Sequence, residues 1–209
     1  IHLQGNPQQQ QSPNVFLLAD ETGSSVGYIQ LPSLGGPCVY GVEWPADLDV
    51  NQSDLISCLA DSMAASIAAY PTAQPCILGG VAFGAVLAIE VARRMPTADV
   101  AGVILLDPSI EAGDVVRTRD RLAKTRVLRP AQVTKIDSAS NAVEKYKFEA
   151  WSSKMKRPVV LIVPEAKDGL DKLSAWLPEA GVRLVDGVQA GGLLRFPGVR
   201  FRHVIFGDP

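Results

Sequence analysis

The chain has 209 residues, of which 47% are hydrophobic and 20% charged, and its formal net charge is -2. These values are typical of one globular domain with a single core, and they argue against a surface built to bind nucleic acid or an anionic membrane, which needs clustered Lys and Arg. No apolar run approaches the ~20 residues of a membrane span. The three cysteines, Cys38, Cys58 and Cys76, have neither disulfide nor zinc spacing, so we expect no metal site, and buried thiols in a reducing cytoplasm.

Residues 1–14 are polar and glutamine-rich, and we expect them to form a flexible linker or leader outside the core. From residue 15 to residue 209 we expect one domain in which short apolar runs alternate with helical patterns. Strands are predicted at residues 14–20, 38–43, 75–80, 100–107, 157–165 and 181–186, and helices at residues 51–70, 84–95 and 170–177. This alternation predicts an α/β fold with a mainly parallel sheet flanked by helices.

Residues 114–151 interrupt the alternation. The segment is charged and weakly periodic, and it lies between two predicted strands. It is too long for a plain connection, so we expect helices within it. A helical insertion over the carboxyl edge of the sheet would act as a lid.

The stretch from Gly80 to Gly84 has the frame of a nucleophile elbow, G-x-S-x-G, with Ala82 at the serine position. A predicted strand precedes it and a predicted helix follows it, as an elbow requires. Side chains at Gly80 and Gly84 would collide with the adjacent strand and helix. The turn would place residue 82 at the positive end of the helix, where an oxyanion is stabilised. The alternative is a tight strand-to-helix turn with no chemistry.

The other members of a catalytic triad would follow in the order acid, then histidine. Asp107 ends a predicted strand, at the edge where ligands bind in such sheets, although an aspartate there could also cap a helix or form a turn. Of the two histidines, His2 lies in the leader, and His203 follows the last predicted strand, where the base would arrive. Asp186, at the end of the strand predicted at residues 181–186, is the rival for the acid role.

Five segments together carry a family resemblance: "VFLLADETGSS", "YGVEWP", "CILGGVAFGAVLAIEVARRM", "GVILLDPSI" and "RHVIFGDP". They resemble the thioesterase domain of a nonribosomal peptide or polyketide synthase, which has an α/β-hydrolase fold. The resemblance is close from about Val15 to Leu106 and hardly extends to the lid. The sequence departs from the family at Ala82, where the family has serine, at Val204, where it has phenylalanine, and in a short lid.

The resemblance implies a Ser-His-Asp mechanism in which position 82 holds the nucleophile, His203 the base and Asp107 the acid. The oxyanion would be held by the backbone N–H of Phe83 and by that of Glu21, with Asp20 and Thr22 as alternatives for the second donor. No cofactor would be bound directly, because the acyl or peptidyl thioester arrives on the phosphopantetheine arm of an upstream carrier domain. Candidate residues for lining the substrate site are Tyr28, Trp44, Tyr146, Phe148 and Trp151, for which ordinary packing is an equal alternative.

Because Ala82 lacks an oxygen, this chain should not form an acyl-enzyme. Serine to alanine is the change that an experimenter makes to trap a substrate, and we expect an inactive Ser-to-Ala form of a chain-releasing thioesterase domain. Release would occur by hydrolysis, cyclisation or condensation. The alternatives are a stand-alone editing thioesterase or esterase, and a natural pseudoenzyme that binds a carrier domain or an acyl group without chemistry.

Overall fold

The computed structural model describes residues 1–7, 12–31, 33–34, 36–71, 75–125, 128–147, 159–164, 183–185 and 201–206. Within these residues, eight strands form one sheet in the order β1-β3-β2-β4-β5-β6-β8-β7. Their bounds are β1 His2–Gln4, β2 Val15–Leu18, β3 Val39–Val42, β4 Cys76–Val81, β5 Val100–Leu106, β6 Val159–Pro164, β7 Arg183–Val185 and β8 Phe201–Phe206. The strands from β2 to β6 are parallel, which confirms the predicted α/β fold, and β1 and β8 join this core antiparallel.

The helices predicted at residues 51–70 and 84–95 are confirmed, and the one predicted at residues 170–177 lies outside the described residues. The described helices are α1 Leu55–Ala68, α2 Phe83–Arg94, α3 Ala112–Thr125 and α4 Pro130–Lys145, with short 3-10 turns η2 Val26–Gln30 and η3 Thr97–Asp99. Alternate residues of β2 separate two cores, because successive side chains of a strand point to opposite faces. Phe16 and Leu18 join the main core with α1, α2 and α4, whereas Val15 and Leu17 pack with Tyr28 of η2. Over the described residues, no helix combines the length and apolarity that a bilayer crossing requires.

The amino-terminal residues correct one expectation. His2–Gln4 is not part of a flexible leader, because it pairs antiparallel with β3 as the edge strand β1. The backbone nitrogen of Ile1 donates to the carbonyl of Gly41 at 2.8 Å. Without β1, the open edge of β3 would expose unpaired backbone groups, and pairing satisfies them.

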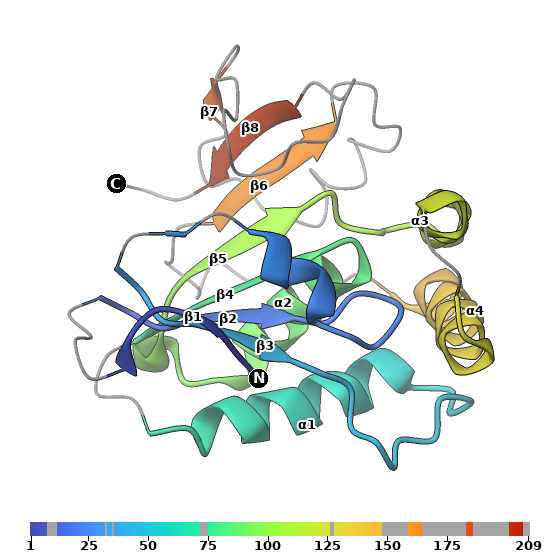
Figure 1. Cartoon of the computed structure of the whole chain (residues 1–209), viewed down its shortest axis with the longest axis horizontal. Helices are drawn as coiled ribbons and strands as arrows, with labels where there is room; N and C mark the ends of the chain where they lie inside the picture. The colour runs from blue at the N-terminus through green and yellow to red at the C-terminus, as the bar shows by residue number, and fades with distance from the viewer. Residues whose placement is uncertain are drawn as a thin grey trace.

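The insertion between β5 and β6 contains two helices, α3 and α4, as expected for residues 114–151. The first of them, α3, begins at Ala112, two residues before the predicted start of the insertion. Both helices lie on the side to which the arrowheads of the parallel strands point (Figure 1), which is the carboxyl edge of the sheet. Ile136, Ala139 and Val143 bury one side of α4 in the main core. This helix is therefore a packed wall of the domain. Phe148 and Trp151 lie outside the described residues.

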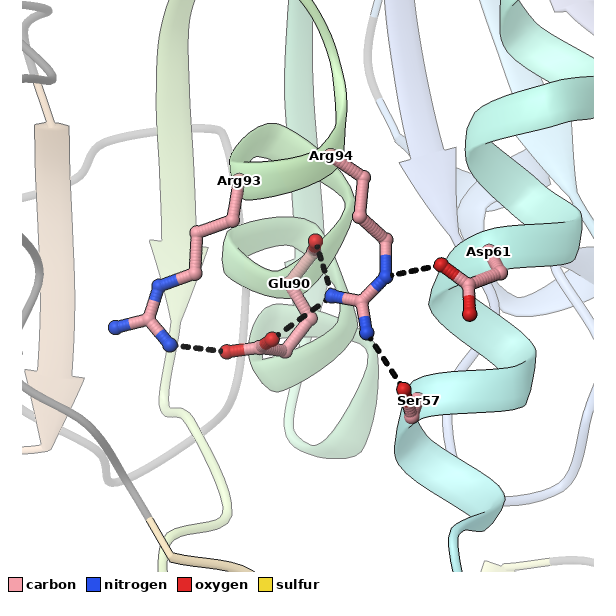
Figure 2. A network of polar contacts seen from close by, with 5 residues as sticks. All are labelled: Ser57, Asp61, Glu90, Arg93 and Arg94. Carbon is pink, nitrogen blue, oxygen red and sulfur yellow. Dashed lines mark hydrogen bonds and ion pairs between the residues drawn. The ribbon is translucent and has the colours of Figure 1, made fainter.

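A polar network holds α1, α2 and α4 together. Figure 2 shows five of its residues, Ser57, Asp61, Glu90, Arg93 and Arg94. The buried carboxylate of Glu90 pairs with Arg93 at 2.7 Å and with Arg94 at 2.9 Å. Arg94 also reaches Asp61 and Ser57 on α1. Burial, and then a hydrogen bond to Glu90, raise the pKa of Tyr146 well above its usual range, so the end of α4 is joined to the same carboxylate.

Candidate active site

The turn between β4 and α2 holds Ala82 in a strained conformation. Its φ is 53° and its ψ is -117°. Residues other than glycine rarely adopt this backbone conformation, which costs about 1–3 kcal/mol of stability. The Ala82 N–H donates to the carbonyl of Leu106 at 2.9 Å, which ties the turn to the end of β5. Residue 82 is thus presented at the carboxyl edge of the sheet, directly before the first turn of α2.

The two glycines of the elbow have the role predicted for them. A Cβ at Gly80 would overlap the backbone of Gly84, and a Cβ at Gly84 would overlap the carbonyl oxygen of Leu18 and lie 2.9 Å from that of Ala19. The turn is therefore packed directly against the loop that follows β2. A side chain at Gly84 would push the elbow away from that loop, and a side chain at Gly80 would push the end of β4 away from the start of α2.

The loop after β2, which the sequence predicts to carry the second oxyanion donor, packs against the elbow at Gly84. The Thr22 N–H donates to the carboxylate of Asp20 at 2.9 Å, and the Gly23 N–H donates to the Asp20 carbonyl at 2.9 Å. The engagement of Thr22 removes it from the three candidates, so Glu21 and Asp20 remain. On the other side, Phe83 is the first residue of α2, and its N–H has no helical carbonyl to bond.

Tyr28 lies beneath the elbow, in the smaller core. Its hydroxyl donates to the carbonyl of Leu18 at 2.7 Å and accepts the N–H of Val81 at 2.9 Å. The Tyr28 hydroxyl thus bridges the backbones at the ends of β2 and β4. Burial raises the pKa of Tyr28 far above its usual range. This placement favours a positioning role over the substrate-lining role that the sequence suggested.

Asp107 directly follows β5, as predicted, beside the strand that ends in the elbow. Its φ is 45°, so it too has a strained backbone. The loop after it is attached at two points. The Ser109 N–H donates to the carbonyl of Ala82 at 3.2 Å, and the buried carboxylate of Asp114 accepts the N–H groups of Ile110 at 3.0 Å and Glu111 at 3.2 Å.

His203 is placed differently from the prediction. It lies within β8, not after the last strand, and its backbone pairs with Ile162 of β6 and Val185 of β7. The segment forms a strand because β6 supplies an antiparallel partner along its whole length. Since Ile162 in turn pairs with Leu106, two strand spacings, about 10 Å, separate the backbones of Leu106 and His203.

Asp186 remains the alternative to Asp107 as the acid of the triad. Asp186 lies outside the described residues, but it follows Val185 in the chain, and Val185 pairs with His203. Asp107 follows Leu106, which lies one strand farther away. The strand order alone therefore does not choose between the two carboxylates.

Trp44 lies at the same edge, two residues after β3. It is 5% exposed, and its ring packs on that of Phe83 with centroids 5.7 Å apart. The ammonium of Lys135, from α4, lies 5.5 Å from the centroid of the Trp44 ring. Tyr146 instead meets Glu90, eight residues along α2 from Ala82, or about 12 Å at the rise of a helix. Tyr146 therefore anchors the end of α4 to α2.

Comparisons with known proteins bear on the sequence and on the fold of the chain. No protein-family profile matches the chain. The chain is 40% identical over 114 residues to the non-reducing polyketide synthase ntnG of Nectria sp., and this alignment covers 51% of the chain. It is 33% identical over 167 residues to the non-reducing polyketide synthase atnG of Arthrinium sp., and this alignment covers 73% of the chain. The aligned parts are only 6% and 8% of those synthases.

Similarity to solved structures identifies the fold of the chain. YbtT, a type II thioesterase of the yersiniabactin pathway, superposes with a TM-score of 0.62 at 18% identity, covering 86% of this chain and 85% of its own. The Vlm2 thioesterase domain gives a TM-score of 0.59 at 15% identity, covering 84% and 83%. The fold is an α/β-hydrolase fold. Within this α/β-hydrolase fold, the turn at Ala82 occupies the strand-to-helix position of a nucleophile elbow.

Sequence patterns alone missed two residues that shape this site, Lys135 and Asp114, and the role of a third, Tyr28. Tyr28 lies in a Gly/Ser loop and gives no local signal of its hydroxyl bridge. In the sequence, nothing distinguishes Lys135 from an ordinary surface lysine of a helix. Asp114 was detectable, because an acid at the third position of a helix is a known capping signal, and α3 begins at Ala112.

Proposed function

We propose that the chain is the chain-releasing thioesterase domain of a polyketide synthase, in a form that lacks its nucleophile. The observation that carries the proposal is the conformation of Ala82, whose φ of 53° is enforced by Gly80 and Gly84. A turn without chemistry would accept glycine at this position and avoid the strain. The likeness to thioesterase structures and the sequence similarity to polyketide synthases support the same conclusion.

In the serine-bearing form, His203 would accept the serine proton, and Asp107 would orient the imidazole and stabilise its charged form. The serine would attack a thioester carried on the phosphopantetheine arm of a carrier domain. The N–H groups of Phe83 and of Glu21 or Asp20 would hold the oxyanion. Water, or an oxygen or carbon nucleophile of the acyl chain, would then release the product, and α3 and α4 would control the access of water.

Ala82 itself favours a second candidate function. A chain with this residue in nature would bind a carrier-borne acyl group without cleaving it, as a pseudoenzyme. Both candidates share the same site and differ only in the presence of an oxygen at position 82. Restoring that oxygen therefore tests whether the remaining residues form a working site.

The test is the Ala82→Ser variant with an acyl pantetheine thioester, measured by the release of free thiol. We expect thiol release from Ala82→Ser and none above background from the parent. A second change of His203→Ala should abolish the gain. Comparing Asp107→Asn with Asp186→Asn in the same background assigns the acid, since the true partner should cost orders of magnitude in rate. A folded Ala82→Ser protein without thiol release would overturn the proposal.

A further inference from the structure

Trp44 presents a buried hydrogen-bond donor beside the elbow. The side chain is 5% exposed, and its indole N–H finds no acceptor among the residues that the structure describes. Indole has only a donor, and a buried donor is normally paired. A donor that the protein leaves unmatched at the edge of a binding site indicates that a ligand supplies the acceptor.

Lys135 adds a cation to the same place. Its ammonium lies over the Trp44 ring, and a Cβ on Gly23 would lie 2.7 Å from its Nζ, so it rests against the loop that carries the oxyanion donor. In the described part of the chain, no ion pair joins Lys135 to a carboxylate. The loop thus has two donors next to it, one neutral and one charged.

We propose that Trp44 and Lys135 form a specificity subsite for a carbonyl oxygen of the acyl chain, close to the thioester. The proposal rests on the proposed function. Contact between the rings of Trp44 and Phe83 places this subsite next to the residue whose N–H would hold the oxyanion. A saturated acyl chain has no acceptor to offer there. A 3-oxoacyl chain does, and a polyketide that has not been reduced retains such oxygens.

The present chain allows the test without turnover. The ligands are two pantetheine analogues in which an amide replaces the thioester, one with a 3-oxobutanoyl chain and one with a butanoyl chain. Calorimetric titration of the parent should give binding about tenfold tighter for the 3-oxo analogue, the effect of one good hydrogen bond. Trp44→Phe keeps the ring and removes the N–H, and Lys135→Met removes the charge. Each should reduce the ratio of 3-oxobutanoyl to butanoyl affinity toward one, mainly by weakening the binding of the 3-oxo analogue.

Tyr40→Phe is the matched control. It removes another buried polar atom, in a ring that packs against Phe16 and Tyr70 away from the elbow, and it should keep the full preference. Equal binding of both analogues to the parent would overturn the inference. So would a Trp44→Phe protein that loses affinity for both analogues alike, since that marks a packing role.

The two proposals fail in different ways. If Ala82→Ser releases thiol but the parent shows no 3-oxo preference, only the subsite is wrong. If neither analogue binds and Ala82→Ser is inert, the proposed function fails and the subsite fails with it.

Discussion

Two non-glycine residues of the described chain, Ala82 and Asp107, have positive φ, and they end neighbouring strands. Strain of this kind persists only where the surroundings enforce it. Glycine would relieve it at position 82, while adding freedom to the unfolded chain. Relief of the backbone strain should stabilise the folded state by about 1–3 kcal/mol, and the greater entropy of the unfolded chain should offset about 0.4–1 kcal/mol of this. Ala82→Gly should therefore raise the free energy of unfolding by about 1 kcal/mol. Urea denaturation measures this, and a destabilised variant would show that the turn is relaxed.

Tyr28 makes a residue-scale prediction about pH. Because burial raises its pKa, the folded phenol stays neutral where an unfolded tyrosine, with a pKa near 10, ionises. Its contribution to stability is therefore complete below about pH 10 and is lost above it, by up to about 1.4 kcal/mol per pH unit.

Tyr28→Phe leaves the N–H of Val81 without its acceptor, so it should destabilise the protein by about 1–3 kcal/mol at pH 8. The variant no longer has this titrating group, so its deficit should narrow at pH 11. Denaturation of both proteins at the two pH values checks the sign. A deficit that is constant with pH would mean that the phenol titrates normally. Tyr40 and Tyr146, whose pKa values burial also raises, are shared by both proteins.

At the scale of elements, the elbow depends on the close approach of α2 to the end of β2. Gly84→Ala would push a methyl group into the carbonyl oxygen of Leu18, and we expect a loss of about 1–3 kcal/mol or more. Gly113→Ala is the matched control in α3, where, among the described residues, a Cβ would meet only Arg117, at 3.7 Å. That change should stabilise the protein by about 0.5–1 kcal/mol, as alanine does in a helix. Thermal melts in which both variants behave alike would contradict a tight elbow.

At the scale of the whole molecule, structural features that depend on residues adjacent in the chain were predictable from the sequence. A strand, glycines and a helix follow one another around Ala82, so the elbow and the parallel sheet could be anticipated. The position of Asp107 directly after β5 followed in the same way, as did the presence of helices in the insertion.

Features made by distant pairing were not predictable. His2–Gln4 is too short to show a strand pattern, and it becomes β1 only because β3 offers an open edge. His203 lies in β8 because β6 supplies a partner about forty residues earlier. The bridge from Tyr28 to Val81 spans 53 residues. Such pairings depend on how the chain closes, which local periodicity does not record.

The most direct test of the central claim is whether an oxygen at position 82 becomes a nucleophile. The Ala82→Ser protein is treated with a fluorophosphonate, and its intact mass and modified peptide are determined by mass spectrometry. We expect one adduct, on residue 82, which is lost in the Ala82→Ser, His203→Ala double variant and absent from the parent. A folded Ala82→Ser protein with no adduct, or with an adduct on another serine, would contradict the account and leave the glycine-flanked turn without a catalytic role.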